Sequence, residues 1–173
     1  DNPAFLNFGK TDREIVYGEG VFVGYRYYEK LETPPLFYFG YGLSYSQFNY
    51  SDLRVPSEYP KDGQMGIALD VTNAGEHDGA AVVQIYISDL ECSVQRPRKE
   101  LKAFRKVLVS KGETRTCHIT LDKYALSFWS EEHSQWRVEA GEFEVIVATS
   151  ADPEDEVSRA KFRLLKTFMW SGV

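Results

Sequence analysis

The stretch "TRTCHITLD" at residues 114–122 decides the fold class, because its polar and apolar side chains alternate. The two faces of this extended segment carry Cys117, Ile119 and Leu121 on one side and Thr116, His118 and Thr120 on the other. Alternation with a period of two predicts a β-strand that buries one face and leaves the other in water. We therefore expect the His118 side chain to face solvent.

The same period recurs on both sides of this segment. Further strands are expected at residues 48–55, 64–73, 80–89, 101–110 and 157–168, with a hairpin over 134–150 around Ala140-Gly141 and a helical turn leading into a short strand over 123–129. The faces expected to point inward carry Ile67, Leu69, Val71, Val83, Ile85, Ile87, Phe143, Val145 and Val147, whereas Val82, Gln84 and Tyr86 are expected to point outward. Seven or eight short strands with no long helix predict an all-β protein, an antiparallel β-sandwich. A parallel sheet would show continuous apolar runs instead.

The first 45 residues show no such period. "VFVGYRYYEK" (21–30) could form a short strand, and "LFYFGYGLSYSQF" (36–48) contains six aromatic residues and two glycines among its thirteen positions. So aromatic a segment is unlike a disordered linker, which is poor in apolar residues. We expect residues 1–45 to be an irregular but ordered arm that lies on another surface.

Aromatic residues also mark the C-terminal part of the chain. The tail "KTFMWSGV" (166–173) is apolar enough that we expect it to dock on a surface through Trp170, on the same partner as the arm. Trp129 and Trp136 flank a predicted turn, where a role in the core or over a sheet edge is favoured over stacking on a sugar.

The composition excludes several classes of protein. The chain has 173 residues and a net charge of −6, with both signs mixed along the sequence. Nucleic-acid binding normally needs a basic patch, so it is not expected. No run approaches the ~18 apolar residues of a membrane-spanning helix. The start at Asp1 is interpreted as that of a mature chain or a fragment.

No motif for catalysis, a cofactor or a metal stands out. Acidic residues at 130–133 ("SEEH") and 152–156 ("DPEDE") are interpreted as solvated turns. The histidines and cysteines are His77, His118, His133, Cys92 and Cys117, and none has the spacing of a metal site or a nucleophile–base pair. The two cysteines could form one disulfide, but two reduced thiols are favoured. Asn49-Tyr50-Ser51 is a glycosylation sequon, which matters only in a secreted protein.

Several segments together resemble one enzyme family. They are "YGEGVFVGYRYYEK" (17–30), "FYFGYGLSYSQFNYSDL" (37–53), "VVQIYISD" (82–89), "RPRKELKAFRKVLVSKGET" (96–114), "LDKYALSFW" (121–129) and "WRVEAGEFEVIVATS" (136–150). In this order they resemble the C-terminal region of glycoside hydrolase family 3 β-glucosidases, and the ending "FMWSGV" is similar to that of fungal members.

The resemblance implies an immunoglobulin- or fibronectin type III-like sandwich over residues 46–173, preceded by an arm (1–45) from an α/β domain. It implies that the catalytic Asp and Glu lie upstream, on a barrel and an α/β domain that would be this chain's partners. The isolated chain is then expected to be inactive and to need no cofactor; an oligomer stays open, and a secreted location is favoured over a cytoplasmic one. The residues expected at the domain interface are Phe22, Tyr25, Tyr27, Phe37, Phe39, Tyr41, Tyr45 and Trp170.

Two other functions are compatible with these residues. The first is a module that binds a carbohydrate or another polymer, and its stacking residues would come from Tyr25, Tyr27, Tyr28, Tyr41 or Tyr45. The second is an adhesion domain, which would rest on the fold alone. Exposed Phe37 and Phe39 would favour the domain junction, whereas a flat exposed pair of Tyr41 and Tyr45 would favour sugar binding.

Overall fold

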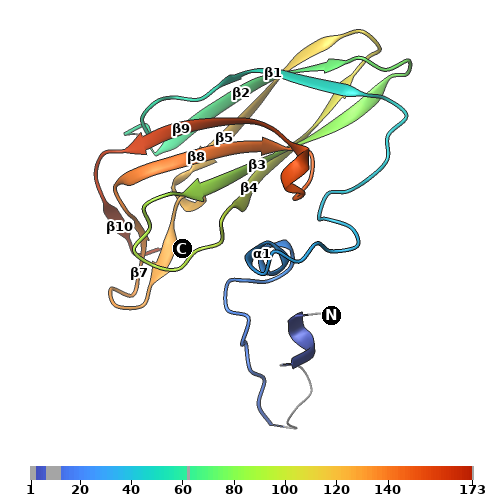
Figure 1. Cartoon of the computed structure of the whole chain (residues 1–173). Helices are drawn as coiled ribbons and strands as arrows, with labels where there is room; N and C mark the ends of the chain where they lie inside the picture. The colour runs from blue at the N-terminus through green and yellow to red at the C-terminus, as the bar shows by residue number, and fades with distance from the viewer. Residues whose placement is uncertain (1–2, 7–12, 62, 173) are drawn as a thin grey trace.

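The sandwich and its arm are both present in the computed structural model, which describes residues 3–6, 13–61 and 63–172 (Figure 1). Part of the predicted arm, residues 1–2 and 7–12, lies outside this description. No helix among the described residues is long and apolar enough to cross a membrane.

Two antiparallel sheets form the sandwich, as the alternating pattern predicts. The first sheet has the order β1-β2-β5, with β1 Phe48–Arg54, β2 Gln64–Asn73 and β5 Thr114–Asp122. The second has the order β4-β3-β8-β9, with β3 Gly79–Asp89, β4 Glu100–Val109, β8 Gly141–Ala148 and β9 Glu156–Leu164. The all-β, antiparallel fold class is confirmed.

The core lies between these sheets and contains the predicted inward faces. Ile67, Leu69, Val71, Val83, Ile85, Ile87, Phe143, Val145 and Val147 are all buried in one cluster. The Phe143 ring stacks on Phe162 of the neighbouring strand, with centroids 5.5 Å apart. On β5, Cys117, Ile119 and Leu121 are buried while His118 is exposed, so the prediction for this strand is confirmed. Neither Cys92 nor Cys117 is in a disulfide.

The predicted hairpin over 134–150 is wrong. β7 (Gln135–Val138) belongs to a third, small sheet with the order β10-β7-β6, in which β6 is Phe128–Ser130 and β10 is Phe168–Trp170. β8 instead pairs with β3 and β9. The chain therefore changes sheets at Ala140-Gly141, because an alternating pattern specifies which face is buried but not which strand is the partner.

The predicted last strand is also divided in two. β9 ends at Leu164, and the chain resumes pairing as β10 only at Phe168. β10 pairs with β7, so the apolar tail docks on the chain's own small sheet. Two short 3₁₀ turns, η2 (Lys123–Ala125) and η3 (Pro153–Asp155), begin at aspartates whose side chains accept a backbone N–H.

The prediction of a strand over 21–30 is wrong as well, because Tyr25–Lys30 forms the helix α1. Gly24 precedes the helix with φ +57, a conformation that interrupts an extended chain and favours glycine. An earlier single turn, η1, spans Pro3–Leu6. Figure 1 shows α1 beside β3 and β4, on the side of the second sheet that faces away from the first.

Candidate functional site

The outer face of the second sheet is covered in part by the arm. Tyr86, Ile146, Ala148 and Ala151 form a second buried cluster, against which Tyr25, Tyr38 and Leu101 pack. The outward-facing Gln84 and Tyr86 are therefore buried, contrary to what their place on the strand suggested. Strand alternation correctly predicts that Gln84 and Tyr86 point away from the core. They are nevertheless shielded from solvent, because the arm, some sixty residues upstream, packs on this outer face.

Tyr25 anchors the arm to this face. Its ring meets Tyr86 edge to face, with centroids 5.8 Å apart, and its hydroxyl oxygen accepts a hydrogen bond from the Leu101 backbone N–H at 2.7 Å. The pairing of β3 with β4 shifts by one residue at this place, between Ala103 and Leu101. Because a β-bulge interrupts the regular ladder, an N–H on the bulged strand is free to bond to the tyrosine.

A polar chain lies beneath the arm, next to the Tyr25 anchor. The Tyr86 hydroxyl donates to Gln84 Oε1 at 2.5 Å, and Gln84 Nε2 donates to the Thr149 carbonyl at 2.9 Å. Gly40 lies against this amide: a Cβ there would be 2.2 Å from Gln84 Nε2, and its φ is +92. Both the space and the backbone conformation thus require glycine at this position.

A buried ionic cluster ties α1 to the sheet. Lys99 is 1% exposed, and its Nζ lies 2.8 Å from Glu156 Oε1 and 3.9 Å from Glu29 Oε1. Burial raises the pKa of Glu29, although the Lys99 charge acts against this. Burial would also raise the pKa of Glu156, but the hydrogen bond and charge of Lys99, with Arg159, outweigh it and the pKa is lowered. Lys99 therefore connects β9, through the ionised Glu156, with the arm, through Glu29.

A second ionic cluster holds the loop between β3 and β4. Arg96 lies 2.7 Å from Glu100 and 3.2 Å from Asp89, and it donates to the Leu126 carbonyl at 2.8 Å. Arg26 of α1 approaches Glu100 at 3.4 Å. Ionic and hydrogen-bonded contacts thus connect the arm with residues 96–102 at several points.

Beyond the anchor, the arm presents a row of exposed apolar side chains. Phe37 is 63% exposed, Phe39 is 56% exposed and Tyr45 is 96% exposed. Phe37 packs against Tyr41 with centroids 5.1 Å apart and planes tilted by 36°. Within the described part of the chain Tyr41 and Tyr45 make no ring contact with each other, so the flat pair expected for a sugar site is not formed.

An apolar groove continues this row onto the sheet. Its volume is about 350 Å³, and Phe39, Gly40, Val82, Gln84, Leu101 and Phe104 line it. Phe104 and Leu108 on β4 are also largely exposed. We call the exposed apolar side chains of the arm and of this part of the sheet the junction surface: Leu36, Phe37, Phe39, Tyr41, Leu43, Tyr45, Val82, Phe104 and Leu108. Apolar surfaces of this extent usually mark an interaction site.

The other predicted interface residues are more buried. Phe22 is half-buried beneath Lys30, whose Nζ lies 3.7 Å from the ring centroid. Tyr27 is half-buried and packs edge to face with Tyr28. Trp170 lies away from the arm, in an aromatic group with Phe168, Trp136 and Tyr124. The structure thus groups Tyr25, Phe37, Phe39 and Tyr41 around the junction surface and places Trp170 elsewhere.

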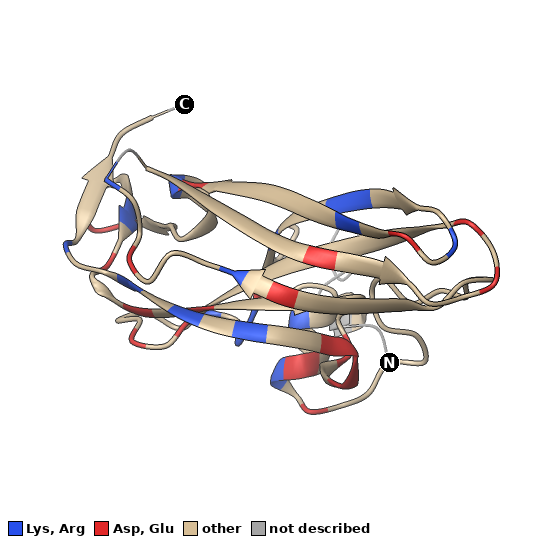
Figure 2. Ribbon diagram, turned by 90° about the horizontal axis from the view of Figure 1, so that it is seen from above, with Lys and Arg blue, Asp and Glu red and all other residues tan. Residues whose placement is uncertain are grey.

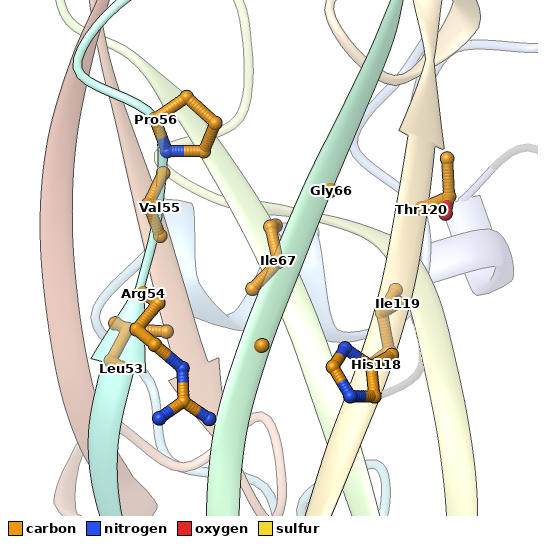
Figure 3. A pocket seen from close by; sticks show the side chains of 10 residues that line it. Leu53, Arg54, Val55, Pro56, Gly66, Ile67, His118, Ile119 and Thr120 are labelled. Carbon is orange, nitrogen blue, oxygen red and sulfur yellow. The ribbon is translucent and has the colours of Figure 1, made fainter.

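The opposite face of the sandwich is polar and open. A hollow lies over Gly66 and Ala68 on β2, and Figure 3 shows Arg54 of β1 on one side of this strand and His118 of β5 on the other. Arg54 is already paired with Asp70 at 2.8 Å. Charged residues of both signs are spread over the strands (Figure 2). Among the described residues no group of three or more His, Cys, Asp or Glu side chains is placed to hold a metal ion.

Comparisons with known proteins agree with this arrangement. A family model described as "Fibronectin type III-like domain" matches residues 81–151, which run from β3 to the end of β8. A β-glucosidase from Kluyveromyces marxianus is 48% identical over 177 residues, which cover 100% of this chain and 20% of that protein. Thermostable β-glucosidase B from Acetivibrio thermocellus is 43% identical over 87% of this chain and 20% of its own length.

Solved structures give the same result. The crystal structure of the Kluyveromyces marxianus β-glucosidase in complex with glucose matches with a TM-score of 0.89 and 46% identity, over 100% of this chain and 20% of that one. A GH3 β-glucosidase from Bifidobacterium adolescentis matches with a TM-score of 0.87 and 38% identity, over 95% of this chain and 24% of that one. Residues 81–151 thus belong to a fibronectin type III-like domain, and the whole chain, arm included, is similar to the corresponding part of these β-glucosidases.

This fibronectin type III-like domain spans about a fifth of the relatives it matches, so it corresponds to one part of a larger enzyme. The match over the whole chain includes the arm as well as the sandwich. Sequence reasoning missed Lys99, Glu29 and Glu156, since nothing local in the sequence connects them.

Proposed function

We propose that this chain is a non-catalytic, C-terminal structural domain of a family 3 β-glucosidase. Residues 1–45 would be the arm that arrives from the preceding α/β domain, and residues 46–173 the sandwich that docks beside it. The whole enzyme would hydrolyse terminal, non-reducing β-D-glucosyl residues with retention of configuration, which requires a nucleophile and an acid/base residue. Both of these catalytic carboxylates would come from the barrel and α/β domains upstream.

The junction surface is the observation that carries this proposal. The arm is fixed to the sandwich at Tyr25 and then exposes Phe37, Phe39 and Tyr41 in the direction of Val82 and Phe104. A domain that stays in place within its enzyme buries an interface of this kind, commonly about 600–1,500 Å² between domains of one chain. The partner we propose for the junction surface is the preceding part of the same polypeptide.

The most buried carboxylates support a structural role. Glu100, Glu156 and Asp89 are each held by a lysine or arginine. A retaining glycosidase instead places two carboxyl groups about 5–5.5 Å apart, open to a sugar, with one of them protonated. These three carboxylates are thus engaged in holding loops and the arm.

Two measurements test the proposal. The purified 173-residue chain should not hydrolyse an aryl β-glucoside above the buffer blank, and catalysed turnover would overturn the structural assignment. In the longer enzyme, the triple variant F37A/F39A/Y41A should lower the melting temperature and the activity that survives heating. The control variant V157A/L165A removes exposed apolar side chains outside the junction surface and should behave like wild type. Equal behaviour of the two variants would contradict docking through this surface.

The alternative of a sugar-binding arm has less support. Tyr25, Tyr27 and Tyr28 are half-buried, and their rings pack edge to face against other tyrosines. A sugar stacks best on an open ring face, so these three residues offer little of what that function needs.

A further inference from the structure

A second groove lies apart from the junction surface, along the free edge of β6. Its volume is about 930 Å³, and it is lined by β6 and β7, by the loop before β4 and by Val21 of the arm. β6 is the outermost strand of its sheet, so one of its sides pairs with no other strand of that sheet. Side chains from several segments of the chain therefore line this groove beside β6.

The indole ring of Trp129 lines this groove and is exposed to solvent, and its orientation is fixed by other aromatic rings. Trp129 is 50% exposed, and it meets Trp136 edge to face with centroids 5.6 Å apart at 81°. Trp136 is held in turn by Trp170, whose ring stacks on it at 6.5 Å and 19°, and by Tyr124 at 5.9 Å and 82°. The tail residue Trp170 thus supports Trp136 from within the domain. A ring held in this way loses little freedom when a ligand stacks on it.

Polar side chains of both signs line the same groove. Glu131 and Glu132 supply carboxylate acceptors from the turn between β6 and β7, and Lys102 and Arg137 supply donors. Arg137 is paired with Glu139 at 3.1 Å and Lys102 with Glu100 at 3.0 Å, so both cations are held in position. The groove therefore combines an open aromatic face with groups that can accept and donate hydrogen bonds.

We propose that this groove binds a β-linked glucosyl oligosaccharide, with one sugar ring stacked on Trp129. A glucose ring with equatorial hydroxyls has two apolar C–H faces and a rim that both donates and accepts hydrogen bonds, which matches an indole flanked by charged groups of both signs. The choice of glucose among sugars rests on the proposed function, whereas the site itself uses no residue of the junction surface.

The direct test is an NMR titration of the 173-residue chain with its three tryptophans labelled with ¹⁵N. Cellotetraose and laminaritetraose are the probes, and glycerol serves as a polyol without a ring face. We expect saturable shifts of the Trp129 and Trp136 indole N–H signals, with a dissociation constant on the order of 1 mM. No shift at ten times that concentration, or equal shifts with glycerol, would overturn the proposal.

Matched variants separate stacking from general effects on the fold. W129A should bind the oligosaccharide about tenfold more weakly, since a stacking contact contributes that much, and W129F should lose less. F5A removes another exposed ring, outside the groove, and should bind like wild type. Binding by W129A that is as tight as wild-type binding would contradict the site. Sugar binding that fails while the junction variants still destabilise the longer enzyme would leave the proposed function intact.

Discussion

Both faces of β3 carry buried side chains, but these are buried in different ways. Val83, Ile85 and Ile87 meet the first sheet in an apolar core. On the other face Gln84 and Tyr86 are covered by the arm and joined by hydrogen bonds. Close packing tolerates many apolar side chains of suitable volume, whereas a buried polar group requires a specific partner. The inner face therefore stabilises the sandwich, and the outer face fixes where the arm lies.

The largest effect should come from the inner face. F143A removes a fully buried ring that stacks on Phe162, and it should lower the free energy of unfolding by about 4 kcal/mol. Urea unfolding followed by fluorescence measures this value. V157A, at a partly exposed position on β9, is the control and should stay within about 0.5 kcal/mol of wild type. If F143A lowered the free energy of unfolding by less than a variant of the outer face does, the conclusion that the inner face stabilises the sandwich would be contradicted.

The largest effect on the outer face should come from the Lys99 cluster. E156Q removes the carboxylate 2.8 Å from buried Lys99, and it should cost about 3 kcal/mol because a buried charge loses its main partner. Glu29, at 3.9 Å, remains as a weaker partner. The double variant K99M/E156L replaces both charges by apolar groups and should regain most of the stability. If the double variant were as unstable as E156Q, packing rather than charge would explain the loss.

Acid should reproduce part of that loss in the wild-type chain. The pKa of Glu156 is lowered in the folded protein, so its stabilising contribution is present above the unfolded pKa of about 4.3 and is lost as the pH falls through the folded value. The pKa of Glu29 is raised, and its contribution has the opposite sign. Urea unfolding between pH 6 and about pH 3 should show a smaller acid loss in E156Q than in wild type. Equal slopes would exclude Glu156 as a contributor.

These two faces also differ in how far the sequence predicts them. Inner-face residues such as Ile67, Ile119 and Val145 follow an alternation that spans each strand, so their burial could be predicted without knowing the partner strand. The exchange of partners between β7 and β8 could not, because both strands show the same alternation whichever neighbour they take. Pairing depends on segments far apart in the chain.

The outer face was harder to predict for a related reason. Lys99 and Glu156 are 57 positions apart, and Tyr25 and Leu101 are 76 apart, so no local pattern connects either pair. The arm's aromatic content predicted that it lies on a surface, and the structure adds that one such surface is the back of β3 and β8. The helix α1 was missed because Gly24 and the tyrosines after it are as common in strands and turns as in a short helix.

A smaller effect should follow from Y25F. The phenylalanine keeps the ring contact with Tyr86 but removes the oxygen that accepts from the Leu101 N–H, so stability should fall by about 1 kcal/mol. Hydrogen exchange at the Leu101 amide should become faster than in wild type. Y27F removes a hydroxyl elsewhere on α1 and should leave this amide unchanged. Unaltered exchange in Y25F would show that the hydrogen bond does not hold the arm.

The smallest effect in the isolated chain should become the most informative in the longer enzyme. Tyr45 is 96% exposed, so Y45A should change the unfolding free energy of the 173-residue chain by less than about 0.5 kcal/mol. If the junction surface is covered by a preceding domain, the same substitution removes a buried ring there and should destabilise the longer enzyme by more than about 1 kcal/mol. F143A, by contrast, should destabilise this domain equally in both contexts, since its neighbours lie within the sandwich. The comparison of the two substitutions in the two contexts thus separates residues that stabilise this domain from residues that join it to other domains. A Y45A effect that stays negligible in the longer enzyme would show that Tyr45 does not join this domain to another.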